Sequence, residues 1–238
     1  MKQDSLPQTA PAVFSWNTAS LDQTSFLEKL GVRTVFQEVP AGEDAQVLEA
    51  LSEFDVYLLT GDPNMELEQM KEAVLRARQG YAGLVLDVEP YGGDAWSTEQ
   101  NREAILNTYC DQMEQLYAYA QEQSVELVLC VPYWYDDLGF SDQLERIVKS
   151  CDGVCVMNYS RGNEQGNIQS EYELAQKYCK KLWTAYELTQ SDGEGVLESN
   201  TYHDQGIRAV TDNYSKYFSN TGIGLAYHDL DSVREATE

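Results

Sequence analysis

Short hydrophobic runs alternate along this chain with longer amphipathic stretches. Eight of these runs are almost continuously apolar, β-branched or aromatic, which is typical of parallel strands covered on both faces. A strand followed by a helix, repeated eight times, predicts an α/β fold, namely a compact, single-domain (β/α)8 TIM barrel. A doubly wound open sheet is the alternative, but no GxGxxG motif follows the first run to support its dinucleotide-binding form. The runs are 12–16, 33–37, 55–60, 83–87, 126–132, 153–158, 181–186 and 222–227.

The amphipathic stretches carry helix start and stop signals. Asp62-Pro63 combines an N-cap with proline at the first helical position. Ser97-Thr98-Glu99-Gln100 resembles a capping box and opens a long helix that we expect to end near Gln123. Gly31 and Gly80 follow helical stretches and are predicted to be C-terminal caps.

Residues 1–11 are polar and contain two prolines, so we predict a disordered lead-in before a barrel that occupies residues 12–238. This stretch contains no hydrophobic core of a signal peptide. That pattern fits a cytoplasmic protein, or a chain trimmed behind an export signal or lipid anchor. Because the lead-in resembles a juxtamembrane linker, we expect the second, which places the protein outside the cell or at its surface.

The charge balance excludes several classes of partner. The chain has 16 basic and 40 acidic residues, a formal net charge of −24. Nucleic acid and anionic membrane surfaces are repelled by such a field, so we expect no nucleic acid partner and no membrane contact by the barrel. A neutral glycan or oligosaccharide is not repelled. The alternative interpretation of the negative charge is that it only keeps the surface soluble.

The cysteine pattern gives no sign of a metal or cofactor. The five cysteines form no CxxC pair, and the chain has only two histidines, so we expect neither a metal nor a cofactor. Cys130 and Cys155 lie inside apolar runs and are expected to be buried thiols. Cys151 and Cys179 each precede a predicted strand and could pair at the bottom of the barrel in an oxidising compartment.

Polar and aromatic residues gather where the predicted strands end. In a barrel of this kind, functional groups lie at the C-terminal ends of the strands. Aromatic rings stack on sugar rings, and carboxylates bind hydroxyl groups and transfer protons, so the combination is typical of a glycan site. The candidate binding residues are Trp16, Glu38, Tyr91, Tyr133, Trp134, Asn158, Glu187, Tyr227 and Asp229.

Several of these residues have an alternative structural interpretation. Three successive aromatic residues, 133–135, cannot all face inward, so at least one is expected to be exposed; packing in the core is the alternative. His228 and Asp229 could form a pH-sensitive pair, but a lone histidine is more often structural.

Asp87 and Glu89 are two residues apart on a predicted strand end, so their side chains point to the same side. Close carboxylates raise each other's pKa, which keeps one of them protonated as a general acid. A solvated pair in an acidic chain is the alternative. The position directly after the apolar run Leu84-Val85-Leu86 favours a functional role.

Residues 82–89 resemble the fourth-strand signature DxxDxDxE of family 18 glycoside hydrolases, and Met157-Asn158-Tyr159 is similar to the MxY(D/N) segment of that family. The spacing of the other strands is compatible over nearly the whole chain. Ala82 and Val85 replace the first two aspartates, Ser160 replaces the residue after the tyrosine, and Tyr227 stands where the family has a tryptophan. The DxE element alone also resembles the lysozyme-like family 25 barrels.

The resemblance implies substrate-assisted hydrolysis of N-acetylhexosamine linkages with retention, an exception to the two-carboxylate scheme. Glu89 is then the general acid, Asp87 holds the acetamido group of the substrate, and Tyr159 hydrogen-bonds it. One alternative is a two-glutamate retaining glycosidase, in which Glu89 and Glu187 lie at roughly 5–5.5 Å. The other is a carbohydrate-binding barrel that lost turnover with the missing aspartates.

Overall fold

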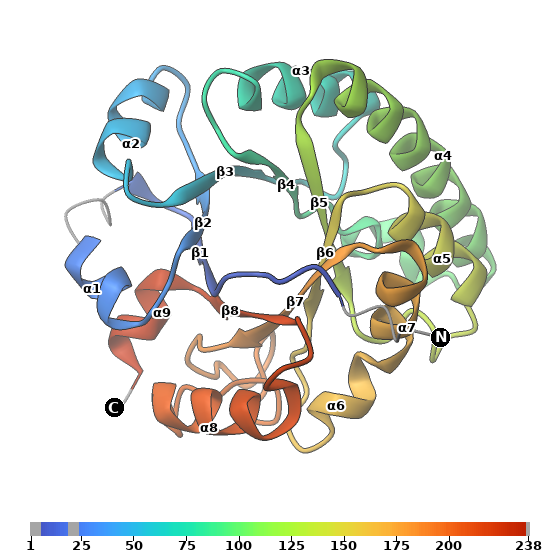
Figure 1. The fold of residues 1–238 in the computed structure, drawn as a ribbon. Coiled ribbons are helices and arrows are strands. Elements are labelled where there is room, and N and C mark those ends of the chain that lie inside the picture. The colour runs from blue at the N-terminus through green and yellow to red at the C-terminus, as the bar shows by residue number, and fades with distance from the viewer. Residues whose placement is uncertain (1–5, 19–23, 237–238) are drawn as a thin grey trace, which may run out of the picture.

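The computed structural model describes residues 6–18 and 24–236, and its centre is a closed barrel of eight parallel strands (Figure 1). The strands pair in sequence order, and β1 pairs with β8 to close the barrel. The predicted (β/α)8 fold is therefore confirmed. The strands are β1 Ala12–Ser15, β2 Thr34–Glu38, β3 Asp55–Thr60, β4 Gly83–Leu86, β5 Glu126–Pro132, β6 Gly153–Met157, β7 Lys181–Glu187 and β8 Gly224–His228.

Helices surround the barrel as an outer layer (Figure 1). The α-helices are α1 Thr24–Lys29, α2 Asp44–Ala50, α3 Leu67–Ala77, α4 Glu99–Gln123, α5 Ser141–Lys149, α6 Glu164–Asn167, α7 Gln169–Tyr178, α8 Gly206–Phe218 and α9 Leu230–Glu235. Two short 3-10 helices, η2 Pro90–Gly92 and η3 Asp94–Ser97, connect β4 to α4.

The helix signals in the sequence have mixed outcomes. Helix α4 has the predicted bounds, and Gly31 and Gly80 both have positive φ, which suits a residue that ends a helix. The predicted helix start at Asp62-Pro63 is wrong. The Asp62 carboxylate accepts a hydrogen bond from the Asn64 backbone N–H and forms a turn, and α3 begins only at Leu67 behind a capping box.

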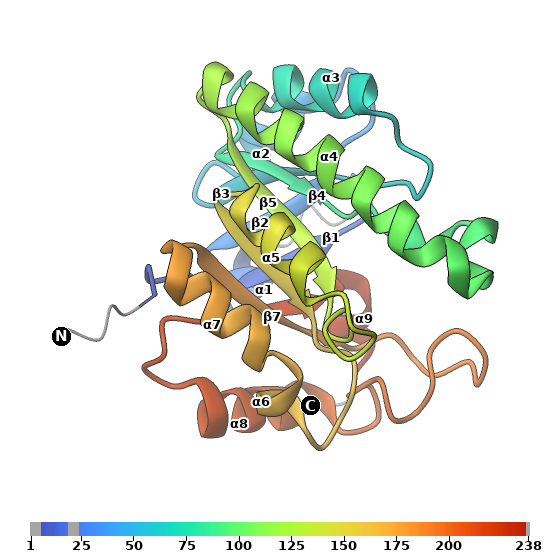
Figure 2. The same ribbon diagram turned by 90° about the vertical axis from the view of Figure 1, so that its right-hand side faces the viewer.

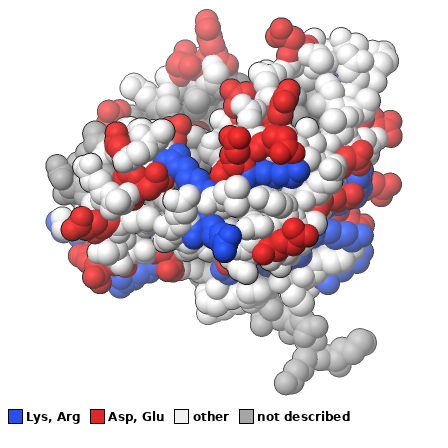
Figure 3. Space-filling view, turned by 90° about the horizontal axis from the view of Figure 1, so that it is seen from above, with Lys and Arg blue, Asp and Glu red and all other residues white. Residues whose placement is uncertain are grey.

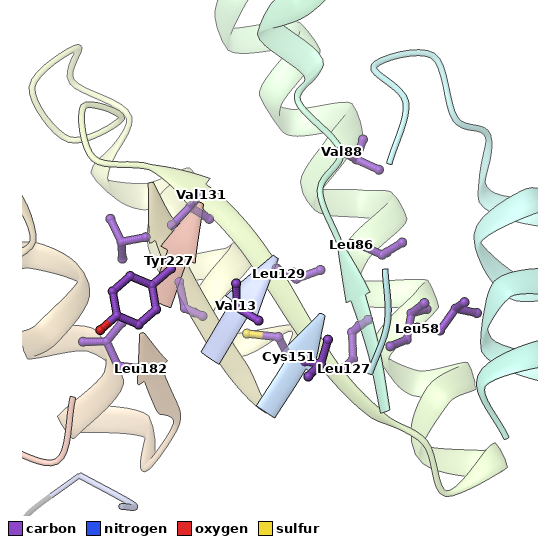
Figure 4. Close-up of a cluster of buried hydrophobic side chains, with 14 of the residues drawn as sticks. Val13, Leu58, Leu86, Val88, Leu127, Leu129, Val131, Cys151, Leu182 and Tyr227 are labelled. Atoms are coloured by element: carbon purple, nitrogen blue, oxygen red, sulfur yellow. The ribbon is translucent and has the colours of Figure 1, made fainter. Parts of the chain in front are cut away.

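Strand alternation divides the buried side chains into two cores. One set faces the helices, and Figure 4 shows part of it, with Val13, Leu182 and Tyr227 among its members. The other set fills the barrel and is formed by Ala12, Phe14, Phe36, Tyr57, Leu59, Val85, Val128, Cys130, Cys155, Met157, Trp183, Ala185 and Ala226. Because side chains alternate with period two, the residue two positions beyond an inward-facing one lies on the same side, nearer the mouth of the barrel.

The N-terminal segment packs against the bottom of the barrel, where the strands begin. The buried hydroxyl of Thr9 donates hydrogen bonds to the carbonyl oxygens of Leu182 (3.2 Å) and Gly222 (2.9 Å). The Trp183 indole donates to the Ala10 carbonyl (2.9 Å), and Leu6 is buried. Residues 6–11 are thus ordered by these contacts instead of forming a disordered lead-in. Residues 1–5 lie outside the described residues.

The five cysteines are free thiols. Cys130 and Cys155 are register partners on β5 and β6 and are buried inside the barrel, as expected. Cys151 is buried and Cys179 is exposed, and they form no disulfide. Within residues 6–18 and 24–236, no group of three His, Cys, Asp or Glu side chains is arranged to hold a metal ion.

Acidic side chains are scattered over the face that carries α2 and α3, with basic side chains between them (Figure 3). Some form ion pairs between neighbouring helices, such as Arg76 of α3 with Asp44 of α2 at 2.7 Å. Partly exposed pairs of this kind contribute little to stability. In the described part of the chain, no helix combines the length and apolar character needed to cross a membrane.

Candidate active site

The end of β4 carries two carboxylates on the inward side. Val85 is buried in the barrel interior, so Asp87 and Glu89 follow on the same side toward the mouth. The neighbouring strand end must come very close to hold them there: a Cβ atom on Gly61 would lie 2.0 Å from the Asp87 carbonyl oxygen. Only glycine fits at that point, so Gly61 fixes the place where the acidic segment leaves the barrel.

Asp87 is the more enclosed of the two acids. Its Oδ1 atom is buried and has no hydrogen-bond partner among the described residues. Burial raises the pKa of Asp87, and the nearby charge of Glu89 raises it further, to about 6, although His228 acts in the opposite direction. This carboxyl therefore keeps its proton to a higher pH than an ordinary aspartate does.

Glu89 lies at the border between the barrel and an aromatic wall. Its Oε1 atom accepts a hydrogen bond from the Tyr91 hydroxyl at 2.5 Å. The Tyr91 ring packs edge-on against Trp134 at 4.9 Å and lies 6.3 Å from Trp96. Burial, followed by the charge of Glu89, raises the pKa of Tyr91, so this phenol is a hydrogen-bond donor and not a phenolate. The Glu89 carboxyl is thus oriented by a rigid neighbour.

Glu89 lines a cavity of about 240 Å³, whereas the more deeply buried Asp87 is not among its lining residues. Acidic, aromatic and small side chains line it, which matches the combination expected for a sugar site. The lining residues are Glu89, Tyr91, Pro132, Tyr133, Trp134, Met157, Tyr159, Glu187, Gly195, Val196 and Asn200. Of the three successive aromatic residues, Tyr135 is buried, whereas Tyr133 and Trp134 are half-buried on the cavity wall.

One wall of the cavity comes from the loop between β7 and α8, residues 188–205. The loop supplies Val196 and Asn200 to the lining. The Asn200 side chain donates a 2.6 Å hydrogen bond to the Tyr159 carbonyl, which attaches the loop to the end of β6.

Glu187 is held by three hydrogen-bond donors. Its Oε1 accepts from the backbone N–H groups of Leu188 (2.9 Å) and Thr189 (2.8 Å), and its Oε2 lies 3.0 Å from Nδ1 of His228. Burial by itself raises the pKa of Glu187, but the hydrogen bond and charge of His228, together with Thr189, outweigh burial and lower it. Glu187 is therefore a fixed carboxylate anion.

His228 at the end of β8 connects Glu187 on β7 to Trp16, which follows the neighbouring strand β1. Its Nε2 atom accepts a hydrogen bond from the Trp16 indole at 3.2 Å. Burial lowers the pKa of His228, but the hydrogen bond and charge of Glu187 exceed that effect, so the net shift is upward. The histidine pairs with Glu187 and not with Asp229, its neighbour in the sequence.

Tyr159 stands between the acidic segment and His228. Its ring centre lies 5.6 Å from that of His228, and it lines the cavity. Among the described residues its hydroxyl has no hydrogen-bond partner, and burial raises its pKa well above the ordinary value. The phenol is thus a neutral donor that is free to bind a ligand.

Two of the predicted binding residues point away from the site. Tyr227 is buried among the residues that face the helices, beside Val13 and Leu182 (Figure 4). Asn158 is also buried, and its amide donates to the Glu164 carbonyl and the Thr184 hydroxyl. These two predictions are wrong because both residues have the outward register of their strands.

Three further candidates, Trp16, Glu38 and Asp229, are not among the residues that line the cavity. The Asp229 carboxylate caps α9 by accepting a hydrogen bond from the Ser232 backbone N–H at 2.8 Å. Glu38 ends β2 with an exposed side chain and is not among the cavity-lining residues. The structure thus gives Asp229 a structural role and leaves Glu38 outside the cavity.

Comparison with known proteins identifies the fold of this chain but not its family. No protein-family model matches the chain, and no curated protein matches it. Among solved structures, a chitinase from Chromobacterium violaceum matches with a TM-score of 0.58 at 11% identity, over 96% of this chain and 99% of the chitinase. The PgaB (BpsB) glycoside hydrolase domain from Bordetella bronchiseptica matches with a TM-score of 0.57 at 10% identity, over 94% and 95% of the two chains.

A TIM-barrel enzyme that catalyses a different reaction is about as similar to this chain as the two glycoside hydrolases are. D-psicose 3-epimerase from Clostridium cellulolyticum matches with a TM-score of 0.56 at 9% identity, covering 93% of this chain and 85% of the epimerase. At such identities the likeness establishes only the fold. The chain has the barrel fold that solved chitinases share with other TIM-barrel enzymes.

Proposed function

We propose that this protein is a glycoside hydrolase that cleaves an N-acetylglucosamine-containing glycan by a substrate-assisted, retaining mechanism. The observation that carries the proposal is the Asp87–Glu89 pair, which lies on the inward side of β4 beside a cavity with aromatic walls. The resemblance of residues 82–89 to the family 18 signature points to the same two side chains. A glycan substrate also agrees with the expected location outside the cell or at its surface.

Each side chain has a defined task in this mechanism. Glu89 protonates the glycosidic oxygen as the leaving group departs and later activates the attacking water. Asp87 accepts a hydrogen bond from the acetamido N–H and turns the carbonyl oxygen toward the anomeric carbon, where that oxygen acts as the internal nucleophile. The free hydroxyl of Tyr159 donates to the same carbonyl group. Tyr91 and Trp134 offer faces for the sugar rings.

The two-glutamate mechanism is less well supported. Glu187 and Glu89 both line the cavity, but both oxygens of Glu187 are already occupied by hydrogen-bond donors. An attack on the anomeric carbon would have to break at least one of these bonds. The contacts support a structural role for Glu187 as an anchor of the loop over residues 188–205.

A carbohydrate-binding barrel without turnover is the second candidate. It is favoured by Val85, which occupies the place of the second signature aspartate and is fully buried below Asp87. No second carboxyl group at position 85 can share a proton with Asp87. Hydrolysis and binding without hydrolysis use the same cavity, so a measurement has to separate them.

The test compares the wild-type protein with Glu89→Gln. Hydrolysis of chitin oligosaccharides, N-glycans and peptidoglycan fragments is measured, and the affinity for the same ligands is determined by calorimetry. We expect Glu89→Gln to lose at least about 10³-fold in kcat while its Kd changes little, since loss of a general acid acts on the transition state. Glu53→Gln, an exposed glutamate before β3, is the matched control. Wild-type protein that binds a glycan but cleaves none would establish the second candidate.

A further inference from the structure

Three side chains form a hydrogen-bonded series across neighbouring strands β1, β8 and β7. The Trp16 indole N–H donates to His228 Nε2 at 3.2 Å, and His228 Nδ1 lies 3.0 Å from Glu187 Oε2. Glu187 is fixed in turn by two backbone N–H groups. The series ends at Trp16, a half-buried indole at the mouth of the barrel.

The donors and acceptors determine where the histidine proton lies. An indole N–H can only donate, so Nε2 of His228 must accept and carries no hydrogen. The proton of the neutral ring is therefore on Nδ1 and points to the Glu187 carboxylate. A second proton would occupy Nε2 and face the indole N–H, which places two donors against each other and breaks the contact with Trp16.

We propose that His228 is a positioning residue for Trp16 that is controlled by its own protonation. The neutral imidazole fixes the indole at the mouth as a platform for the glycan, and the imidazolium releases it, so that glycan affinity falls on acidification. We rely on the proposed function only for the identity of the ligand. The coupling between imidazole and indole exists without it.

The groups around His228 act on it in opposite directions. Glu187, Asp229 and Asp87 lie near the ring and favour its charged form. Burial and the Trp16 donor favour the neutral form, and the rings of Phe14 and Tyr159 pack at 5.3 and 5.6 Å. The net effect of burial and carboxylates is to raise the pKa of His228, so the imidazolium form is favoured as the pH falls.

NMR on the unliganded protein tests the coupling directly. The chain has two histidines and four tryptophans, so His203→Gln and Trp16→Phe assign the relevant signals. We expect the Nδ1–H tautomer at high pH, and a Trp16 indole shift that follows the same midpoint as the His228 ring. Trp16→Phe keeps an aromatic ring but removes the donor, so it should raise the His228 midpoint by about 0.5–1 pH unit. Trp96→Phe is the matched control and should leave it unchanged.

Glycan binding tests the consequence for the ligand. The Kd of a chitin oligosaccharide is measured in Glu89→Gln above and below the His228 midpoint, and again after adding Trp16→Phe. We expect weaker binding at the lower pH, by about 3-fold or more, and a smaller pH effect in the double variant. Equal affinity at both pH values, or separate midpoints for Trp16 and His228, overturns the inference. Absence of glycan binding at any pH overturns the proposed function and the platform role, while NMR still decides whether His228 controls Trp16.

Discussion

The hydroxyl of Tyr91 donates a 2.5 Å hydrogen bond to Oε1 of Glu89, two residues before it in the chain. Both residues belong to the segment that leaves β4, and the phenol, whose ring packs against Trp134, orients the proposed acid. We expect Tyr91→Phe to lower kcat about 10-fold with little change in KM, the size of effect for one hydrogen bond to a charged group. Steady-state kinetics measure this, with Tyr119→Phe on α4 as the control. Equal kcat for both variants contradicts the orienting role.

Asp87 makes stability depend on pH. Its pKa is about 6 in the folded protein against 3.8 for an ordinary aspartate, so between these values the folded protein holds a proton that the unfolded chain has released. The folded state is favoured below pH 4 and loses up to about 3 kcal/mol as the pH rises to 6. Asp87→Asn removes this penalty, so its advantage over wild type should grow from pH 4 to pH 6. Urea unfolding at several pH values measures it, and parallel stability curves for the two proteins would refute it.

Glu187 should act on stability more than on chemistry. Glu187→Ala leaves two buried backbone N–H groups and His228 without their acceptor, and we expect a loss of about 2–4 kcal/mol in the free energy of unfolding. Azide or formate should not restore activity to this variant. If added azide rescues turnover and yields a glycosyl azide, Glu187 is a nucleophile and the two-glutamate mechanism is right.

Gly61 should tolerate no side chain. Gly61→Ala places a Cβ atom 2.0 Å from the Asp87 carbonyl oxygen, so the end of β4 must move. We expect a loss of about 2–4 kcal/mol in stability and a reduced kcat, since both carboxylates shift with the backbone. Gly93→Ala is the matched control, because its Cβ atom meets only Pro90 O at the ordinary distance of 3.8 Å. Thermal unfolding of the two variants decides the matter, and similar midpoints would speak against a close approach at Gly61.

The barrel could be predicted from the sequence because each strand is buried on both faces and therefore appears as a short apolar run. The same two-residue period places Asp87, Glu89 and Tyr159 inside once Val85 and Met157 are known to face inward. The same period explains why the prediction of Tyr227 as a binding residue was wrong. Tyr227 occupies the outward register, whereas His228, counted two residues from Ala226, has the inward one.

Other parts of the site depend on contacts that no local pattern encodes. The loop over residues 188–205 has no hydrophobic period, and its place beside the cavity is set by tertiary hydrogen bonds such as that of Asn200 with the Tyr159 carbonyl. The partner of His228 could not be read from the chain either, because Glu187 lies on a neighbouring strand and Asp229 is adjacent in sequence. At Asp62 the local pattern itself was misleading. Aspartate is typical of helix starts, but here its carboxylate stabilises a turn.

The packing of Thr9 and Ala10 under the barrel determines at which end of the molecule another group can be attached. The chain enters at the closed end, and the loops that carry the cavity lie at the opposite end, as Figure 2 shows. A group attached to this N-terminal segment would therefore lie at the end of the barrel away from the cavity, and the cavity would stay accessible to a ligand.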